Sequence, residues 1–430
     1  MKEDFLHYIW QHQYFDKTAL ATAEGDLLQV LHTGFYNTDA GPDFKEALLK
    51  IGEVEWSGSV EIHLKASDWF RHQHQSDPKY DQVVLHVVWE ADKAVHRIDD
   101  ESVVPVLELR SRVKPELLQT YQQLQLAKST IPCAAFWPNV PGITKTIMLE
   151  RTLAERLEQK GKEVLQVYRS YGNDWEQATY NTLLKGFGFK INQQAFDQLA
   201  KALPQTVVRR HHQSLLQVEA LLFGQAGFLE EAEDAYVKQL QKEHAFLSHK
   251  YGLQSNVVER HQWNFLRMRP ANFPTVRLAQ LAAVLHQHQA LFTKLVEAKD
   301  VKTYEALFMV PVSVYWQQHY LPGKETKAVQ KALGKSSAQN LVINVAVPLM
   351  AAYANFSGER AYLEKAVWLL EQLKEASNKY TRQYEELGWQ AKTAADNQAA
   401  LSLYKKYCQP VNCLRCAIGN KVMKQNGLAA

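Results

Sequence analysis

The chain has 430 residues, of which 46% are hydrophobic, 22% are charged and four are cysteine. This composition excludes a disordered chain, a collagen-like repeat and a disulfide-rich scaffold, and the length suits two or three domains. The net charge of +3 conceals a balance of −10 over residues 1–110, with 10 Lys and Arg against 20 Asp and Glu, and a balance of +13 over the remainder, with 39 against 26.

The first 110 residues predict a domain of mixed α and β structure. Apolar residues at helical or alternating spacing, bounded by turn residues, define its elements. The predicted elements are a helix over 3–13, strands over 27–31, 47–51 and 58–64, a short helix from Ser67 and strands over 83–89 and 103–109. The second and third strands are expected to form a hairpin across 52–57, a turn longer than the two-residue type.

From Pro115 onward, long helical patterns follow one another between Pro-rich or Gly-rich breaks. The first four helices are expected at 115–127, 144–171, 174–187 and 192–203. No fixed-period repeat is present, so a regular solenoid is not expected. The predicted fold class is therefore α+β, with a mixed α/β domain over 1–130 and a large all-α domain over 131–430 that a C-terminal cysteine cluster closes.

The strand at 58–64 carries the densest polar chemistry. Side chains two apart on a strand share a face, so Glu61, His63 and Lys65 are expected to lie together. An ordinary half-buried strand also has one polar face. An acid, an imidazole and an amine downstream of Pro42–Asp43 nevertheless favour a functional site.

The order helix, three strands, helix, strand resembles the restriction-endonuclease-like core (αβββαβ) of the PD-(D/E)XK nuclease superfamily. There a Pro-Asp opens the second strand and an acid-x-Lys lies on the third, and Pro42–Asp43 and Glu61 match these positions. The resemblance implies that Asp43 and Glu61 bind Mg²⁺ or Mn²⁺ for phosphodiester hydrolysis. Where the superfamily has lysine this chain has His63, and Lys65 follows two residues later, so either is a candidate for the third catalytic group.

A second set of metal ligands overlaps the first. His72, His74 and Asp77, together with His63, have the donor atoms that zinc or another transition metal takes. On a helix, residues two apart diverge by about 200°, so His72 and His74 share a site only if their segment is loop or strand. Each histidine alone is more commonly structural, and His86, inside an apolar strand, is expected to be a hydrogen-bonded core residue.

The cysteines lie at two places in the chain. Cys408, Cys413 and Cys416 form a C-x4-C-x2-C cluster, and Cys133 stands alone. Four thiolates suit a tetrahedral zinc ion, and three close cysteines with a distant fourth also suit an iron–sulfur cluster. A structural metal site of one of these kinds is expected, and the alternative is buried thiols that cap a terminal helix.

The excess of basic residues after residue 110 favours binding of a polyanion to this part of the chain. The alternative is that the two parts of the chain differ only in surface charge. In the segment FLRMRPANFPTVR, Arg267, Arg269 and Arg277 lie beside Trp263 and Phe273. Arginines interleaved with aromatic residues suit phosphate contacts and base stacking. Nucleic acid is therefore the expected partner of the helical region, and a solvated helix face is the alternative.

A membrane-spanning or secreted protein is not expected. The longest weakly polar run, 341–354, is shorter than the roughly 20 residues of a spanning helix. The N-terminal sequence MKEDFLHYIW has acids where a signal peptide has a basic region. A cytoplasmic location is expected, where cysteines are commonly reduced or metal-bound.

Several strings spread along the chain resemble a bacterial family known as "domain of unknown function 2851". They are AGPDF, GSVEIH, SDWFRHQH, LHVVWE, EALLFGQAGFL, RPANFPTVRLAQLA and YCQPVNCLRCAIG. This family has no established activity, so the resemblance implies kinship without a reaction. The leading hypothesis is thus a metal-dependent nuclease. A zinc hydrolase that uses the histidines and a non-enzymatic interaction module on a degenerate nuclease core are the alternatives, and the oligomeric state stays open.

Overall fold

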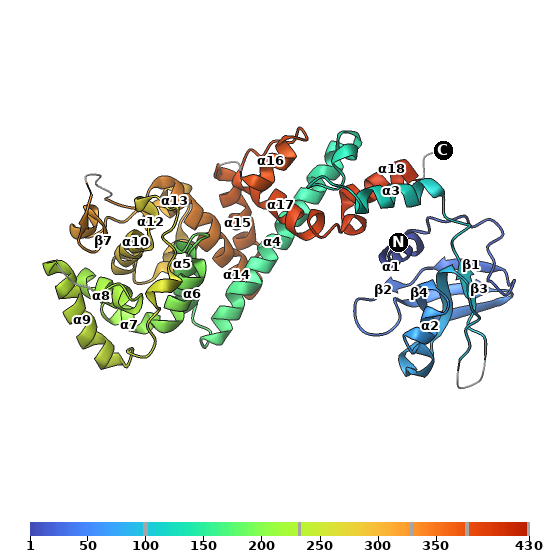
Figure 1. The fold of residues 1–430 in the computed structure, drawn as a ribbon, viewed down its shortest axis with the longest axis horizontal. Helices are drawn as coiled ribbons and strands as arrows, with labels where there is room; N and C mark the ends of the chain where they lie inside the picture. Colours follow the sequence, from blue (N-terminus) through green and yellow to red (C-terminus); the bar gives the residue numbers. More distant parts are fainter. Residues whose placement is uncertain (98–101, 231–233, 327–330, 375–377, 428–430) are drawn as a thin grey trace. The chain divides into compact units, whose positions relative to one another are not determined.

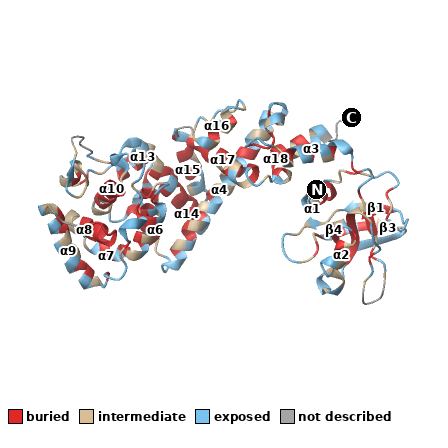
Figure 2. Cartoon of the chain, viewed as in Figure 1, coloured by how far each residue is buried: buried red, intermediate tan, exposed pale blue. Residues whose placement is uncertain are grey.

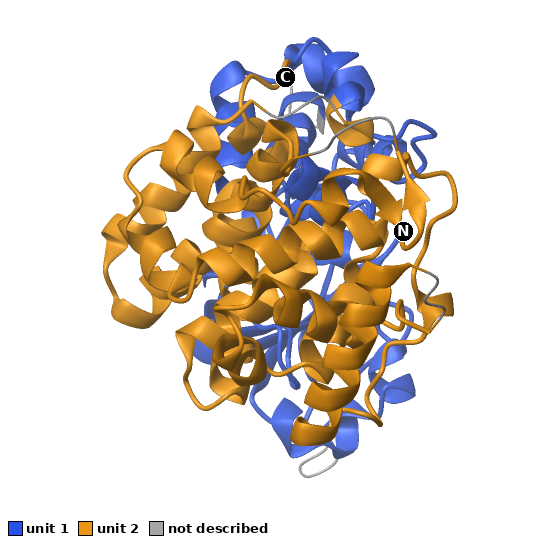
Figure 3. Cartoon of the chain, turned by 90° about the vertical axis from the view of Figure 1, so that its left-hand side faces the viewer, with its two compact units in different colours: residues 1–151, 382–389, 400–430 blue, residues 152–381, 390–399 orange. Residues whose placement is uncertain are grey.

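The computed structural model describes residues 1–97, 102–230, 234–326, 331–374 and 378–427. The chain divides into two compact units, which Figure 3 colours separately. Unit 1 comprises Met1–Arg151, Arg382–Trp389 and Ala400–Ala430, and unit 2 comprises Thr152–Thr381 and Gln390–Ala399. The predicted α+β class is confirmed, because a mixed sheet near the N-terminus is followed by many helices (Figure 1).

The N-terminal part of unit 1 is built around one mixed sheet. Its elements are α1 (Glu3–His12), β1 (Leu28–His32), β2 (Phe35–Tyr36), β3 (Phe44–Ile51), β4 (Val54–Lys65), α2 (Asp68–Arg71), β5 (Val83–Glu90), β6 (Val106–Glu108) and α3 (Pro115–Gln125). The strand order is β1-β3-β4-β5-β6, with β2 also paired to β3. β3 is antiparallel to both β1 and β4, whereas β4, β5 and β6 run parallel. The predicted succession of helix, three strands, helix and strand is present, and β2 is an additional strand.

Two strand boundaries differ from the sequence prediction. Ile51 pairs with Val54, so the hairpin turn has only two residues and β4 starts four residues earlier than expected. The first residues of β4, Val54 to Ser57, are all exposed, so this end of the strand extends beyond the buried core from which the strand was predicted. β6 begins only at Val106, because Pro105 has no N–H to donate to a sheet.

The strands that carry the candidate site lie in the middle of the sheet. β4 pairs with β3 on one side and with β5 on the other, and its residues from Ser59 to His63 are buried (Figure 2). At Gly58 a Cβ atom would lie 2.5 Å from Val84 Cγ1 and 2.6 Å from the carbonyl oxygen of Gln82. The approach of β4 to β5 therefore requires glycine at this position.

Helices make up most of the remaining chain, and the predicted helices at 144–171, 174–187 and 192–203 are found within two residues at each end. The further main elements are η3 (Ala134–Asn139), α4 (Gly142–Ser170), α5 (Trp175–Phe187), α6 (Gln193–Ala202), α7 (Gln205–Arg210), α8 (Leu215–Gln225), α9 (Ala235–Tyr251), α10 (Pro274–Gln287), α11 (Leu291–Glu297), α12 (Val301–Phe308), β7 (His319–Leu321), β8 (Lys324–Glu325), α13 (Lys335–Leu341), η7 (Val342–Ala346), α14 (Val347–Ser357), α15 (Arg360–Gln372), α16 (Lys379–Glu385), α17 (Ala394–Leu403), η8 (Tyr404–Cys408), η9 (Cys413–Arg415) and α18 (Ala417–Gly427). In unit 1, α18 packs against α3, so segments from both ends of the chain share one core.

One helical stretch of unit 2 is apolar enough to cross a membrane by length and composition alone. This stretch, Lys335–Ser357, is the only one of its kind in the described part of the chain. It exceeds the run expected from sequence because α13, the π-helical turn η7 and α14 are continuous. Of its most apolar window, 67% is buried inside the protein, as in a core helix.

Candidate metal centre

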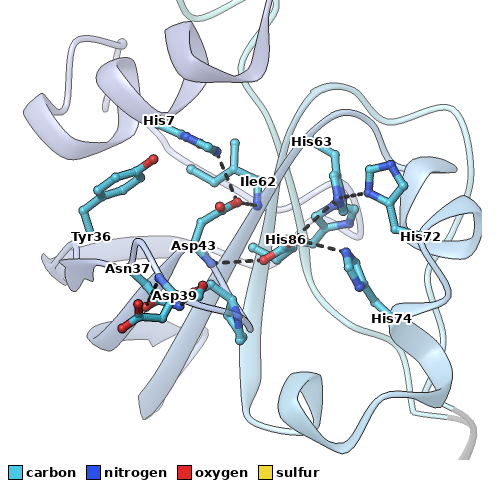
Figure 4. Close-up of polar contacts among 12 residues, drawn as sticks. His7, Tyr36, Asn37, Asp39, Asp43, Ile62, His63, His72, His74 and His86 are labelled. Atoms are coloured by element: carbon cyan, nitrogen blue, oxygen red, sulfur yellow. Dashed lines mark hydrogen bonds and ion pairs between the residues drawn. The ribbon is translucent and has the colours of Figure 1, made fainter. Parts of the chain in front are cut away.

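Two carboxylates meet where β3 begins beside β4. The backbone N–H of Asp43 donates to Glu61 Oε2 at 3.1 Å, and the backbone N–H of Ile62 donates to Asp43 Oδ2 at 3.0 Å (Figure 4). Each carboxylate is thus held by a main-chain donor from the other's strand segment. The structure therefore brings together the Asp43 and Glu61 that the sequence pairs as metal ligands, and it fixes the orientation of both.

The loop before β3 positions Asp43. The side-chain amide of Asn37 donates to the carbonyl oxygens of Asp39 at 3.1 Å and Pro42 at 3.0 Å, and the backbone N–H of Asn37 donates to the carbonyl of Asp43 at 2.7 Å. These hydrogen bonds hold the two ends of the loop together. They fix Pro42 and Asp43 before the sheet begins.

Four histidines lie in contact with one another beside Glu61, and two of them contact its Oε1. His63 Nδ1 lies 2.9 Å from His86 Nε2, and His63 Nε2 lies 3.1 Å from His72 Nδ1 (Figure 4). Glu61 Oε1 lies 3.4 Å from His63 Nε2 and 3.2 Å from His74 Nε2. Ligand atoms of His63, His72 and His74 all lie within 4.8 Å of one another, and among the described residues no other group of three or more His, Cys, Asp or Glu does so.

A left-handed residue makes this convergence of histidines possible. α2 ends at Arg71, His72 follows it, and Gln73 adopts φ 60° before His74 starts a short 3₁₀ turn, η1 (His74–Ser76). His72 and His74 are therefore on a turn rather than on one helix, which is the condition for a shared site. Tyr80 stacks on the ring of His74 with 3.8 Å between ring centroids.

Burial controls the charges of the site. It raises the pKa of Glu61 to about 9, and the nearby charge of Asp43 adds to the rise. Burial also lowers the pKa of His63 to about 2 and that of His86 to about 3, with neighbouring imidazoles acting in the same direction. These two imidazoles are neutral at physiological pH, so the contact between His63 and Glu61 is a polar contact rather than an ion pair. Neutral imidazole nitrogens and carboxylate oxygens are the donor atoms that divalent transition metals take.

Helix α1 contributes two residues that the sequence analysis missed. His7 Nε2 lies 3.2 Å from Asp43 Oδ2. Burial raises the pKa of Glu3, and the charges of His72 and His7 oppose this rise, which places Glu3 beside the same cluster. Glu3 and His7 are four residues apart and so share a helix face. The spacing places both residues on one face of α1, but only the packing of α1 against β4 brings that face to the site.

Two of the predicted site residues do not contact the other candidate ligands directly, although the charge of Asp77 raises the pKa of His74 against the larger lowering effect of burial. Lys65 is exposed at the end of β4. Burial raises the pKa of Asp92, but hydrogen bonds from Ser67 lower it further than burial raises it, and the charge of Lys65 adds to the lowering. Asp77 Oδ1 accepts the backbone N–H of Lys79 at 3.0 Å and so caps a turn. His86 is fully buried and hydrogen-bonded, as a core histidine is expected to be.

All four cysteines are buried and belong to unit 1. Burial raises the pKa of Cys133, and the thiols of Cys408, Cys416 and Cys413 add to the rise, so the distant cysteine lies near the C-terminal three. Tyr384 Oη lies 3.4 Å from Cys408 Sγ.

The three predicted nucleic-acid contacts separate into two environments of unit 2. Arg267 and Arg269 are exposed, whereas Arg277 is buried. The guanidinium carbon of Arg277 lies 4.3 Å from the ring centroid of Phe189. Trp263 is buried and donates its indole N–H to the carbonyl of Ala226 at 2.9 Å. Only Arg267 and Arg269 are therefore placed for a surface contact.

Comparison with known proteins gives the chain a family. The chain matches none of the curated proteins and none of the solved structures with which it was compared. The restriction-endonuclease-like interpretation of the sheet therefore stays a prediction. One family model, described as "Protein of unknown function (DUF2851)", matches residues 3–379, which include the sheet and the whole His and carboxylate cluster. The resemblance expected from the sequence strings is confirmed, and the chain belongs to the DUF2851 family of proteins of unknown function.

Proposed function

We propose that the protein is a metal-dependent nuclease that hydrolyses phosphodiester bonds. The observation that carries this proposal is the reciprocal pair of hydrogen bonds between Asp43 and the Glu61–Ile62 segment. It holds two carboxylates side by side before any ligand arrives. One or two carboxylates are the usual protein contribution to a Mg²⁺ or Mn²⁺ site in phosphoryl chemistry.

The proposed chemistry assigns a role to each side chain. A divalent cation, when bound, supplies an acidified water and neutralises charge on the phosphate. Asp43 and Glu61 hold the cation, and the backbone donors keep their free oxygens in place. His63 is a better candidate than Lys65 for orienting the attacking water, because His63 Nε2 lies 3.4 Å from Glu61 Oε1 and Lys65 is exposed at the strand end.

Cleavage assays on matched variants test the nuclease proposal. Single- and double-stranded DNA and RNA are incubated with wild type, Asp43→Asn and Glu61→Gln in the presence of Mg²⁺ or Mn²⁺. We expect each variant to lose roughly 100-fold or more in rate, since each removes a metal ligand. The control is Glu53→Gln, which removes an exposed carboxylate of the same sheet and should retain wild-type activity. Equal residual cleavage in all four proteins would contradict the assignment.

A second candidate function is a hydrolase that uses zinc or another transition metal. The close grouping of His63, His72 and His74, with Glu61 Oε1 beside two of the rings, favours it. Metal content by mass spectrometry separates it from the first. We expect His72→Ala to lose a bound transition metal that the exposed-surface variant His249→Ala retains. Retention of that metal by His72→Ala would exclude this candidate.

We also propose nucleic acid as the partner, the cytoplasm as the location and a structural metal at the four cysteines. Arg267 and Arg269 support the first because they are exposed cations in one segment. All four cysteines are buried in unit 1, where metal ligation requires thiols and so suits a reducing compartment. Nucleic-acid binding without cleavage in the assay above would favour an interaction module on a degenerate nuclease core.

A further inference from the structure

Arg277 is a buried cation that lacks a counter-ion. Its side chain is held in the first turn of α10, and the residue is only 6% exposed. Burial lowers its pKa to about 10, which still leaves the guanidinium charged at neutral pH. No carboxylate lies within ion-pair distance of Arg277 in the part of the chain that the structure describes. Glu305, a buried acid of α12, contacts other groups, Lys335 at 3.8 Å and Gln339 at 2.7 Å.

The donors of Arg277 are only partly satisfied. Nη1 donates to Gln280 Oε1 at 2.9 Å, and Nη2 donates to Asn272 Oδ1 at 2.6 Å and Ser337 Oγ at 3.2 Å. All three acceptors are neutral. Nε is buried and has no hydrogen-bond partner among the described residues. Since Nε and Nη2 share the guanidinium edge that binds oxyanions in a bidentate manner, this edge is left incomplete.

A pocket of about 340 Å³ opens beside this guanidinium. Arg277 lines it together with two of its three hydrogen-bond acceptors, Asn272 and Ser337. The apolar surface of the pocket comes from side chains of three segments of unit 2. The apolar lining residues are Phe187, Phe189, Ile191, Phe196, Met268 and Pro274.

The walls of this pocket are fixed before a ligand enters. Asn192 ties them together, because its side chain donates to the carbonyl of Asn264 at 3.0 Å and accepts the backbone N–H of Asn264 at 2.7 Å. Phe189 is held beneath the guanidinium by the cation–π contact. A pre-formed apolar pocket with a few convergent polar groups is the usual form of a small-molecule site.

We propose that this pocket binds a small organic oxyanion, with its phosphate or carboxylate group on Arg277 and its apolar body against Phe189, Ile191 and Met268. The oxyanion accepts from the free Nε and shares the Nη2 edge, and so supplies the missing counter-charge. Ser337 and Asn272 are neutral hydrogen-bonding groups at the same edge, which suits an anion better than a cation. The pocket lies wholly in unit 2, so this inference stands or falls separately from the nuclease proposal.

The proposal can be tested by introducing a carboxylate beside Arg277, which leaves Arg277 itself unchanged. In Ser337→Asp a carboxylate is introduced next to Nη2, and Ser337→Asn is the neutral control of the same size. Binding of phenyl phosphate and of benzoate is measured by isothermal titration calorimetry at millimolar concentrations, with benzyl alcohol as the uncharged analogue. The two anions distinguish a phosphate site from a carboxylate site.

We expect wild type and Ser337→Asn to bind at least one of the two anions and not benzyl alcohol. Ser337→Asp should bind it roughly 10- to 100-fold more weakly, as loss of charge-assisted hydrogen bonds predicts, and should have a higher melting temperature than Ser337→Asn in the absence of ligand. The proposal is overturned if wild type binds neither anion, or if Ser337→Asp binds as tightly as wild type.

Discussion

At the scale of single residues, Glu61 is subject to opposing influences. Its Oε2 accepts the backbone N–H of Asp43, which favours the ionised carboxylate. Burial and the charge of Asp43 act more strongly and raise the pKa of Glu61 to about 9. The neutral imidazole of His63 offers no positive charge. A bound cation would favour the ionised form, so metal binding and proton release are coupled at this residue.

The raised pKa of Glu61 predicts a pH-dependent stability in metal-free protein. The folded state keeps this proton up to a pKa of about 9, whereas the unfolded state releases it near 4.5, so the free energy of unfolding falls as pH rises between these values. We expect urea unfolding in EDTA to show wild type losing roughly 1–3 kcal/mol more than Glu61→Gln between about pH 5 and about pH 8.

The comparison of wild type with Glu61→Gln cancels the other titrating groups. The neutral histidines, whose pKa values are lowered, destabilise both proteins alike as pH falls below their unfolded value of 6.5. Glu53→Gln should follow the wild type, because that side chain is exposed. An identical pH dependence in wild type and Glu61→Gln would show that Glu61 is ionised in the folded protein.

At the scale of secondary-structure elements, the seam between β4 and β5 determines where the site lies. The parallel register pairs Glu61 with His86 and His63 with Val88, so His86 on β5 lies level with the candidate ligands on β4 and contacts His63. Gly58 lies just before this level, where a Cβ atom would be 2.6 Å from the carbonyl of Gln82. The carbonyl of Gln82 belongs to the backbone just before β5, which cannot move aside as a flexible side chain could.

Gly58→Ala is therefore expected to destabilise the protein by roughly 1–3 kcal/mol, because the added methyl group overpacks the strand seam. Thermal or urea unfolding measures the effect. Gly142→Ala is the matched control, since a Cβ atom there meets nothing within 4 Å and the residue begins a helix, where alanine is favourable. Equal stability of the two variants would mean that β4 and β5 can separate at Gly58 without cost.

Much of this arrangement of strands could be predicted from the sequence. Apolar alternation located the strands, and the two-residue period placed Glu61 and His63 on one face. Periodicity could not place His72 and His74, because their convergence depends on the left-handed backbone of Gln73, and that conformation is not typical of glutamine. His7 was missed for a different reason, since its role depends on how α1 packs against β4 rather than on a local pattern.

At the scale of the whole molecule, the two ends of the chain meet in unit 1. Cys133 interacts with three thiols that follow it by more than 270 residues, and α3 packs with α18. The sequence predicted this closure from cysteine counting alone, since four thiols are the number a metal site needs. Four thiols that lie near one another suit either a single zinc ion or an iron–sulfur cluster, and metal analysis distinguishes the two.

The cysteine site predicts that residues distant in sequence lose one metal together. We expect Cys133→Ser and Cys413→Ser each to lose the same bound metal and to lower the melting temperature, as removal of a structural metal does. Iron and sulfide analysis with a visible absorption spectrum identifies a cluster, and colourless protein with zinc identifies a single ion. Tyr384→Phe is the control, because it removes a hydroxyl near Cys408 and leaves all four thiols. Metal retained by Cys133→Ser would separate that residue from the site.

The discontinuity of unit 1 also sets an order of events during translation. A ribosome releases the sheet and α3 early, but α18 and the last three cysteines emerge only about 260 residues after Arg151. At roughly 5–20 residues per second this interval lasts about 13–50 s. The nascent sheet and α3 are therefore exposed to chaperones and proteases while unit 2 is still being made, and a chain that stops before residue 400 would leave unit 1 without α18 and three of its cysteines.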